Sequence, residues 1–330
     1  MKISVAMCTY NGEKYIKKQI ESILNQSLAV DEIVICDDGS NDKTIEIIEQ
    51  FQLENPKIIS LQKNQVNLGS NKNFEKAISI CDGDYIFLSD QDDIWKKDKV
   101  KKIIQYFYEN ESLEAIFTNG ELINDKNEKF TEISLWDSVS FMEDQLKNLN
   151  DLYLHLIFKS NMVTGATLCI KKEIKNLILP FPDIKNLHHD EWIAVIIASR
   201  KKIGYLKEEL ISYRLHSEQQ IGTKLRIKKN RLKNNHLIID QILGNSIPKS
   251  YTDHRRLAKV YYNNYLKFKK FSNNQKNDSH FIFKEISELN LEFFKKCNFS
   301  LKKTNPVFYI FTNIIDKIRG KRQLNKQQTV

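Results

Sequence analysis

Two aspartates one residue apart, Asp90 and Asp92, follow an apolar run at 85–89 that is typical of a buried strand. Carboxylate oxygens in this arrangement suit a hard divalent cation, Mg²⁺ or Mn²⁺, that keeps coordination positions open for diphosphate oxygens. The charge of such a cation offsets the negative charge that grows on a departing diphosphate. The same stretch could instead be a polar turn in which Asp93 caps the next helix. On its own, the Asp-x-Asp pattern is weak evidence for a metal site, so its interpretation depends on the other motifs.

A second acidic pair, Asp37 and Asp38, ends the strand-like run 32–36 and precedes Gly39 and Ser40. A carboxylate here can accept the N3–H of a pyrimidine, a charge-assisted hydrogen bond that contributes about 1.5–3 kcal/mol. Asp-Gly is also a turn signal, and Ser40 can cap the following helix. We expect both roles, with Asp38 binding the base and Gly39 and Ser40 forming the turn.

A third acidic site lies at the start of a helical run, where Asp190 and Glu191 follow His188 and His189. An attacking hydroxyl has a very high pKa, so a carboxylate must take its proton as the new bond forms. The alternative is an acidic helix N-terminus that complements the helix dipole. Further along, His216 is a lone histidine, and a neutral imidazole is a common metal ligand.

Glycine-rich phosphate-binding motifs are absent. No G-x-G-x-x-G follows the first strand-like run, and no G-x-x-x-x-G-K-[ST] occurs anywhere in the chain. These absences argue against a dinucleotide-dependent dehydrogenase and a P-loop enzyme. A metal ion is therefore expected to take the role of binding phosphate.

The elements that must position these residues alternate through the first 120 residues. The expected strands are 3–8, 32–36, 57–61, 84–89 and 113–118, and the expected helices are 15–24, 44–51, 73–80 and 99–108. Short buried strands separated by helices predict a mainly parallel, doubly wound α/β sheet. Ligands bind such sheets beyond the carboxyl ends of the strands, which is where the polar motifs lie.

Charge divides the chain near residue 220. Residues 221–330 carry a formal charge of +17, whereas residues 1–220 carry −8. Five widely spaced cysteines without a C-x-x-C pair are expected to be reduced thiols of a cytoplasmic protein. The start of the chain lacks a signal-peptide pattern, and the apolar run 307–315 is too short to span a bilayer.

The ordered set of motifs resembles a family 2 glycosyltransferase of the GT-A fold over residues 1 to about 220. The matching segments are Ser4–Asn11, Val34–Ser40, Asp90–Asp92, Gly165–Ala166, His189–Asp190 and His216. Within that family, the segments Ser89–Trp95, His188–Asp190 and Tyr213–His216 further resemble the bacterial rhamnosyltransferase branch.

The resemblance implies a role for each matching residue. It implies nucleotide-sugar binding by Thr9, Tyr10, Asn11, Asp38, Asp90 and Gly165, metal binding by Asp90, Asp92 and His216, and proton removal from the acceptor by Asp190. The family often has Glu-Asp at the base position, whereas here His189 precedes Asp190 and Glu191 follows it. The implied domains are a GT-A catalytic domain at 1–220, with a nucleotide-binding half at 1–120 and an acceptor half at 121–220, and a basic helical region at 221–330.

The implied reaction is inverting transfer of one sugar, with rhamnose from dTDP-rhamnose as the first choice, to a hydroxyl of a saccharide or lipid-linked acceptor in bacterial surface polysaccharide synthesis. The Q-x-x-R-W motif of processive synthases is absent. One alternative is a UDP-hexose donor on the same scaffold, and another is a catalytically silent nucleotide-sugar-binding protein. Nucleic-acid binding is disfavoured because the basic region lacks a known motif and the first part is acidic.

The basic region 221–330 also carries many aromatic residues at helical spacing. We expect it to dock on the catalytic domain through an apolar face and to turn Lys and Arg toward an anionic membrane. The alternative is a basic helical cap without lipid contact. The expected location is therefore cytoplasmic, with peripheral contact at the inner face of the membrane.

Overall fold

The computed structural model describes residues 1–129, 131–139, 141, 143–216, 240–244, 248, 250–273 and 279–318. The chain divides into two compact units, of which the first comprises 1–150 and 161–228 and the second comprises 151–160 and 229–330. No pattern in the sequence indicates that the short segment 151–160 groups with the C-terminal part. The expected boundary near residue 220 and the basic run 226–231 lie outside the described residues.

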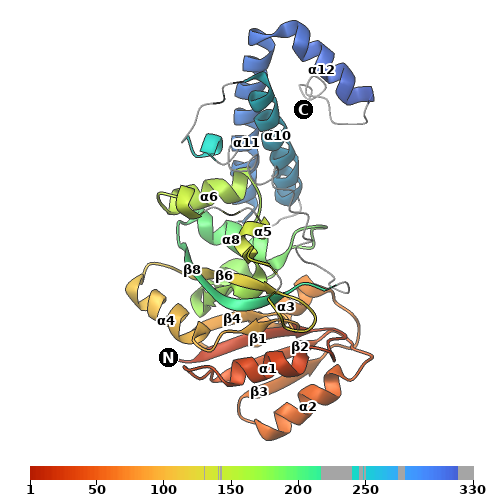
Figure 1. Ribbon diagram of the computed structural model, residues 1–330, viewed down its shortest axis with the longest axis vertical. Coiled ribbons are helices and arrows are strands. Elements are labelled where there is room, and N and C mark those ends of the chain that lie inside the picture. Colours follow the sequence, from red (N-terminus) through yellow and green to blue (C-terminus); the bar gives the residue numbers. More distant parts are fainter. Residues whose placement is uncertain are drawn as a thin grey trace. The chain divides into compact units, whose positions relative to one another are not determined.

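The first unit is built on a mixed sheet whose described strands follow the order β3-β2-β1-β4-β7-β6-β8-β5 (Figure 1). The strands are β1 (Ile3–Thr9), β2 (Glu32–Asp37), β3 (Ile59–Lys63), β4 (Tyr85–Ser89), β5 (Ile94–Trp95), β6 (Ala115–Ile123), β7 (Cys169–Lys171) and β8 (Ile203–Arg214). Neighbours are parallel from β3 through β4, as expected, and β6 is parallel to β8. Strand β7 is antiparallel to β4 and β6, and β5 is antiparallel to β8.

Helices follow most strands of the first unit. They are α1 (Ile16–Leu24), α2 (Thr44–Glu54), α3 (Ser70–Ile80), α4 (Lys99–Glu109), α5 (Leu135–Val139), α7 (Lys175–Ile178) and α8 (His189–Ser199), with 3-10 turns at Glu143–Gln145, Gly165–Thr167 and Lys172–Ile174. The four helices expected before residue 110 are confirmed to within a few residues of their ends.

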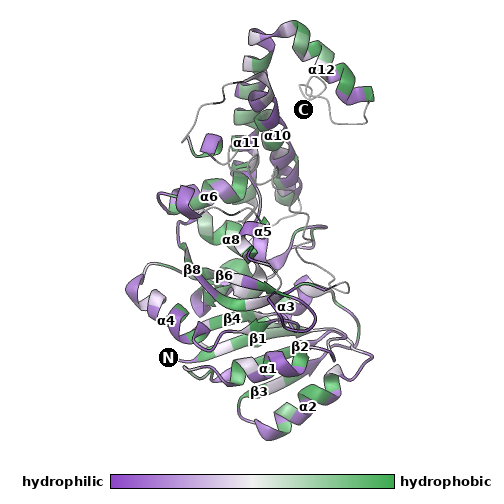
Figure 2. Ribbon diagram, viewed as in Figure 1, coloured by the Kyte–Doolittle hydropathy of each residue, from purple (hydrophilic) through white to green (hydrophobic). Residues whose placement is uncertain are grey.

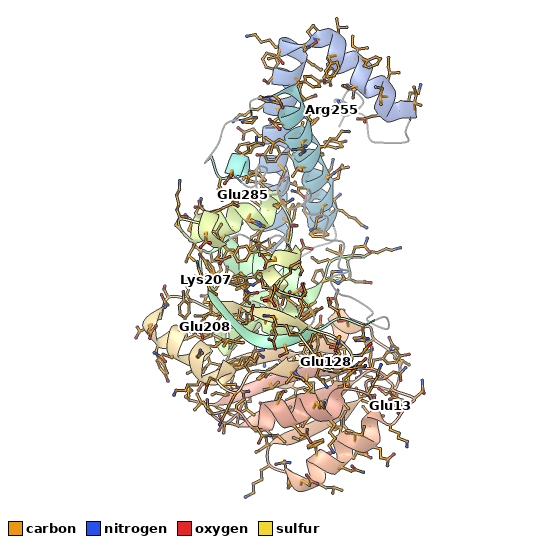
Figure 3. All side chains as sticks on the ribbon, viewed as in Figure 1. Glu13, Glu128, Lys207, Glu208, Arg255 and Glu285 are labelled. Carbon is orange, nitrogen blue, oxygen red and sulfur yellow. The ribbon has the colours of Figure 1, made fainter. Side chains whose placement is uncertain are left out.

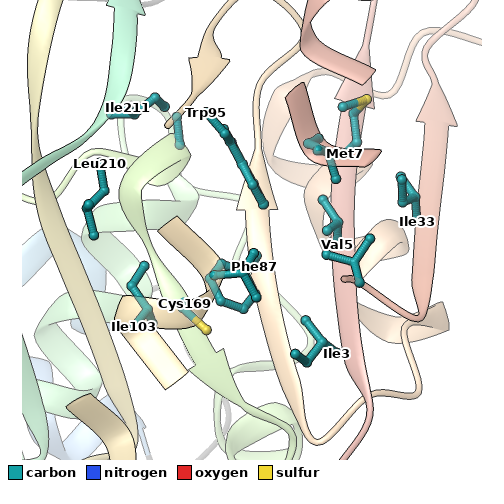
Figure 4. Packing of buried hydrophobic residues seen from close by; sticks show 14 of the residues in the cluster. Ile3, Val5, Met7, Ile33, Phe87, Trp95, Ile103, Cys169, Leu210 and Ile211 are labelled. Atoms are coloured by element: carbon teal, nitrogen blue, oxygen red, sulfur yellow. The ribbon is translucent and has the colours of Figure 1, made fainter. Parts of the chain in front are cut away.

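The core lies on both faces of the sheet because successive strand side chains point to opposite faces. Val5 and Met7 of β1 belong to one buried cluster with Ile33 of β2 and with Ile20 of α1 (Figure 4). On the other face, α3 contacts β1 and β2 and buries Phe74. Burial on two faces explains why these strands have almost continuous apolar runs.

The second unit contains α6 (Leu149–Phe158) from Asp151 onward, together with α10 (Tyr251–Asn273), α11 (Ser279–Thr304) and α12 (Pro306–Ile318). Helices α10 and α11 pair lengthwise through aromatic rings, with Tyr262 against Phe294 and Phe268 against Phe283. The order of these pairs makes the helices antiparallel. The ring of Phe158 on α6 lies 5.2 Å from that of Tyr261, which ties α6 to the hairpin.

All five cysteines are free, and Cys36, Cys81 and Cys169 are buried. No helix in the described ranges combines the length and hydropathy needed to cross a membrane.

Candidate functional site

A cavity of about 950 Å³ opens in the first unit, beyond the carboxyl ends of β1, β2 and β4. Its lining includes every residue to which the family resemblance implied a binding or catalytic role: Thr9, Tyr10, Asn11, Asp38, Asp90, Asp92, Gly165, Asp190 and His216. Residues 207 positions apart in the chain therefore meet at one place. This convergence follows from the parallel arrangement of the strands, which brings their carboxyl ends to a common edge.

Gln91, the middle residue of the acidic motif, ties two of the loops together. Its side-chain amide accepts a hydrogen bond from the backbone N–H of Tyr10 at 2.8 Å and donates one to the backbone carbonyl of Tyr10 at 2.9 Å. A Cβ atom on Gly12 would lie 2.2 Å from the Gln91 Oε1 atom, so only glycine leaves room for this clamp. The sequence offered no signal for Gln91 beyond its place between the two aspartates.

The two aspartates after β2 have different tasks. Asp37 is fully buried and accepts hydrogen bonds from the Thr9 hydroxyl at 2.7 Å and from the backbone and hydroxyl of Ser40 at 2.8 and 2.6 Å. It therefore fixes the turn. The Asp38 carboxylate lines the cavity and accepts hydrogen bonds from the Asn64 amide and from the backbone N–H groups of Leu68 and Gly69.

The turn after β1 is joined to the turn after β2 through Asn11. Its backbone N–H donates to the Ser40 hydroxyl, and its side-chain oxygen accepts from the backbone N–H of Asn41, both at 2.8 Å. Asn11 has a φ of 49°, a left-handed conformation that asparagine adopts more readily than most residues. The turns after β1 and β2 are thus braced against each other.

Asp90, Asp92 and Asp190 form an acidic cluster in the cavity lining. The pKa of Asp90 is raised to about 7, mainly by burial and also by the nearby carboxylates of Asp92 and Asp190. The Nε2 atom of His216 lies 2.9 Å from the Asp92 carboxylate. Within the part of the chain that the structure describes, no group of three or more His, Cys, Asp and Glu is arranged to hold a metal ion.

Arg214, two residues before His216, is fully buried beneath this acidic cluster. Its guanidinium donates to the backbone carbonyls of Asp92 at 2.6 Å and Asn124 at 2.7 Å, and to the Asn127 side chain at 2.7 Å. The guanidinium also lies 4.6 Å from the centre of the Tyr15 ring. A single side chain therefore anchors the loop that carries Asp92.

Arg214→Lys is expected to lower stability because one ammonium group cannot reach acceptors in three directions. A buried carbonyl left without a donor costs about 1–3 kcal/mol, which thermal and urea unfolding would measure. The matched control is Arg200→Lys, because the Arg200 side chain is 43% exposed in its ion pair with Glu114 and such pairs contribute little. Equal effects of the two changes would contradict the anchoring role.

Asp190 occupies the first turn of α8 and faces the cavity. Its carboxylate accepts hydrogen bonds from the Asn161 amide at 3.1 Å and the Gly165 backbone N–H at 3.2 Å. Gly165 has no space for a side chain, since a Cβ atom there would lie 2.4 Å from the His189 imidazole. Glu191 is buried and is not part of the cavity lining.

His189 supports this region by packing and stays uncharged. Its imidazole stacks on the Phe74 ring with a centroid distance of 4.0 Å, and burial lowers its pKa to about 3. His189 stands where the family often has a glutamate before the aspartate. In this chain it has a packing function beside Gly165.

Comparison with known proteins agrees with this geometry. Residues 4–162 match the model of glycosyl transferase family 2. The dTDP-rhamnosyl transferase RfbG of Shigella flexneri is 30% identical over 241 residues, which cover 67% of this chain and 75% of that protein.

Two solved structures share the fold. TarS of S. aureus in complex with UDP-GlcNAc has a TM-score of 0.53 at 16% identity, and the match covers 90% of this chain and 83% of that chain. The mannosyltransferase PcManGT of Pyrobaculum calidifontis, in complex with GDP-Man and Mn²⁺, has a TM-score of 0.53 at 13% identity, covering 92% and 76%. The chain belongs to glycosyltransferase family 2 and has the GT-A fold.

Proposed function

We propose that this chain is an inverting, non-processive glycosyltransferase that moves one rhamnose from dTDP-rhamnose to a hydroxyl of a saccharide or lipid-linked saccharide. The observation that carries the proposal is that Asp90, Asp92, His216 and Asp190 line a single cavity together with Asp38. The choice of rhamnose as the donor sugar is supported by the 30% identity to a dTDP-rhamnosyl transferase. We place the reaction in bacterial surface polysaccharide synthesis, at the cytoplasmic face of the membrane.

A UDP-hexose is the competing donor, since TarS, with the same fold, binds UDP-GlcNAc. Thymine and uracil present the same N3–H donor, so the proposed base contact serves either nucleotide. Direct comparison of donors is therefore the decisive experiment. Thermal shift with a panel of nucleotide sugars and Mn²⁺ should give its largest rise with dTDP-rhamnose. A larger rise with a UDP-hexose would overturn the choice of sugar, and no rise with any donor would overturn the proposal.

The nucleoside is assigned to the side of the cavity that carries Asp38. A carboxylate has about four acceptor positions. The described contacts of Asp38 fill two positions on Oδ1 and one on Oδ2. One acceptor position is left for the N3–H of a pyrimidine.

Asp38→Ala should weaken binding of the free nucleoside diphosphate by about 1.5–3 kcal/mol, the contribution of one charge-assisted hydrogen bond. Titration calorimetry measures this loss. Because Asp38 also holds the 64–69 loop, Asn64→Ala is the matched control, as it removes one loop contact and keeps the carboxylate. Unchanged affinity in Asp38→Ala, or an equal loss in Asn64→Ala, would argue against the base contact.

A divalent cation, Mg²⁺ or Mn²⁺, suits the acidic side of the cavity. Two carboxylates and an imidazole are ligands that Mn²⁺ accepts, and a bound cation would favour the ionised form of Asp90, whose pKa is raised mainly by burial. Asp90, Asp92 and His216 would hold the ion. When bound, it would supply positive charge to neutralise the diphosphate of the donor.

Asp190 is the proposed general base. As the acceptor oxygen bonds to the anomeric carbon, its proton passes to the Asp190 carboxylate, and the bond to the nucleoside diphosphate breaks on the opposite face of the sugar. This displacement inverts the anomeric carbon. The hydrogen bonds from Asn161 and Gly165 hold the carboxylate in a fixed orientation, which lowers the cost of reaching the reactive geometry.

A further inference from the structure

Helix α12 packs with its polar side inward. Tyr309, Asn313 and Asp316 are buried, whereas an ordinary amphipathic helix would bury its apolar residues. The Tyr309 hydroxyl donates to the Asn298 side chain at 2.9 Å. Asp316 accepts a hydrogen bond from Lys259 at 2.6 Å.

Asp316 is also paired with the guanidinium of Arg255, which donates to the Thr312 backbone carbonyl at 3.0 Å as well. Arg255 lies on α10 (Figure 3). The carboxylate is 9% exposed, so these ion pairs are shielded from solvent. Directional contacts of this kind fix the rotation of α12 about its axis. The outward side is therefore set by specific interactions within the second unit.

The outward side of α12 is apolar. Six large side chains are between 43% and 78% exposed, and we call them the α12 apolar face: Val307, Phe308, Ile310, Phe311, Ile314 and Ile318. At about 100° per residue they fall within an arc of about 160°. Figure 2 shows hydrophobic residues along the whole length of this helix. Leaving so much contiguous apolar surface in water is unfavourable, so the face needs a partner.

Basic residues accompany this face in the sequence. Lys317 lies in the last turn of α12, next to the apolar arc at about 100° per residue, and the sequence that follows, 319–330, contains four basic residues and no acidic one. An apolar helical face with basic residues at its edges suits the interface of an anionic bilayer, where apolar side chains enter the acyl boundary and lysines meet lipid phosphates.

We infer that the α12 apolar face inserts into the interfacial layer of an anionic membrane and anchors the enzyme there. A second copy of the chain fits this surface less well, because a symmetric pair would bring like charges together at its rim. The sequence expectation turned Lys and Arg of region 221–330 toward the lipid, and this inference adds the α12 apolar face to that contact. Under the proposed function, the anchor would hold the enzyme near a lipid-linked acceptor.

Flotation with full-length protein tests the inference. Wild type should float with vesicles of phosphatidylcholine and phosphatidylglycerol at low salt, and less with phosphatidylcholine alone. Phe311→Asp combined with Ile314→Asp should lower the bound fraction by about tenfold or more, because charged groups replace inserted apolar ones. Leu53→Asp is the matched control, since Leu53 is 80% exposed on α2 in the other unit.

Three outcomes would overturn the inference: no flotation of wild type, equal flotation of the α12 variant and wild type, or a dimer without lipid that the α12 substitutions dissociate. Thermal unfolding confirms that the variants fold. Transfer to a soluble acceptor should be unchanged in the α12 variant. A failure of the proposed function would appear as absent transfer or donor binding with flotation intact, so the two failures are distinguishable.

Discussion

Asp92→Asn is expected to lower the rate of sugar transfer by about 10²–10⁴-fold without unfolding the protein. The substitution removes a negative charge and keeps the side-chain volume, and charge neutralisation by a bound metal supplies several kcal/mol, each 1.36 kcal/mol being tenfold in rate. Asp92 lines the cavity 2.9 Å from His216, so the change falls on a pair proposed to bind the ion.

Two comparisons test this prediction: removal and re-addition of the metal ion, and a matched control substitution. Wild-type enzyme treated with EDTA should lose transfer and regain it when Mn²⁺ or Mg²⁺ is added back, whereas Asp92→Asn should stay low. Asp84→Asn is the control, because Asp84 is exposed just before the start of β4, at the other end of the strand. Full wild-type activity in excess EDTA would refute metal dependence.

The alternation of apolar strands and amphipathic helices was strong enough to predict the first part of the fold. The strands Ile3–Thr9 and Tyr85–Ser89 are buried on both faces, and such strands have continuous apolar runs that a sequence displays clearly. Strand β7 spans only Cys169–Lys171, which is too short for a period-2 pattern to appear. Its antiparallel pairing with β4 depends on contacts between distant segments that no local pattern reveals.

The lining of the site was predicted from motifs, but the division of labour within it was not. The sequence assigned a role to Asp38 but none to its neighbour Asp37, which fixes the turn while Asp38 lines the cavity. Gln91 and Arg214 act through hydrogen bonds to backbone groups 81 and 122 residues away. Such pairings depend on the tertiary arrangement, so neither residue type nor spacing could have identified them.

The orientation of α12 illustrates the same limit. Its apolar residues have a helical period, and the usual interpretation places them inward. Asp316 forms ion pairs with Arg255 and Lys259 that reverse that orientation. Each pair joins residues more than 50 positions apart in the sequence. The hydropathy of a helix alone therefore does not determine which of its sides packs inward.

Asp190 and Glu191 offer a direct choice between two carboxylates for the proposed base. Both lie in the first turn of α8, where neighbouring side chains point about 100° apart, so one substrate cannot easily meet both. Only Asp190 lines the cavity, and Glu191 is 5% exposed. The geometry therefore supports the choice that the family resemblance implied.

Asp190→Asn should lower transfer by about 10²–10⁴-fold, the usual range for loss of a general base, while nucleoside diphosphate and Mn²⁺ bind as in wild type. Steady-state rates and titration calorimetry separate these two effects. Glu191→Gln is the neighbouring control and should change the rate far less, with its unfolding midpoint recorded because the side chain is buried. An inactive Glu191→Gln beside an active Asp190→Asn would reassign the base to Glu191. If both variants keep full activity, a single carboxylate base does not drive the reaction and the inverting displacement must be abandoned.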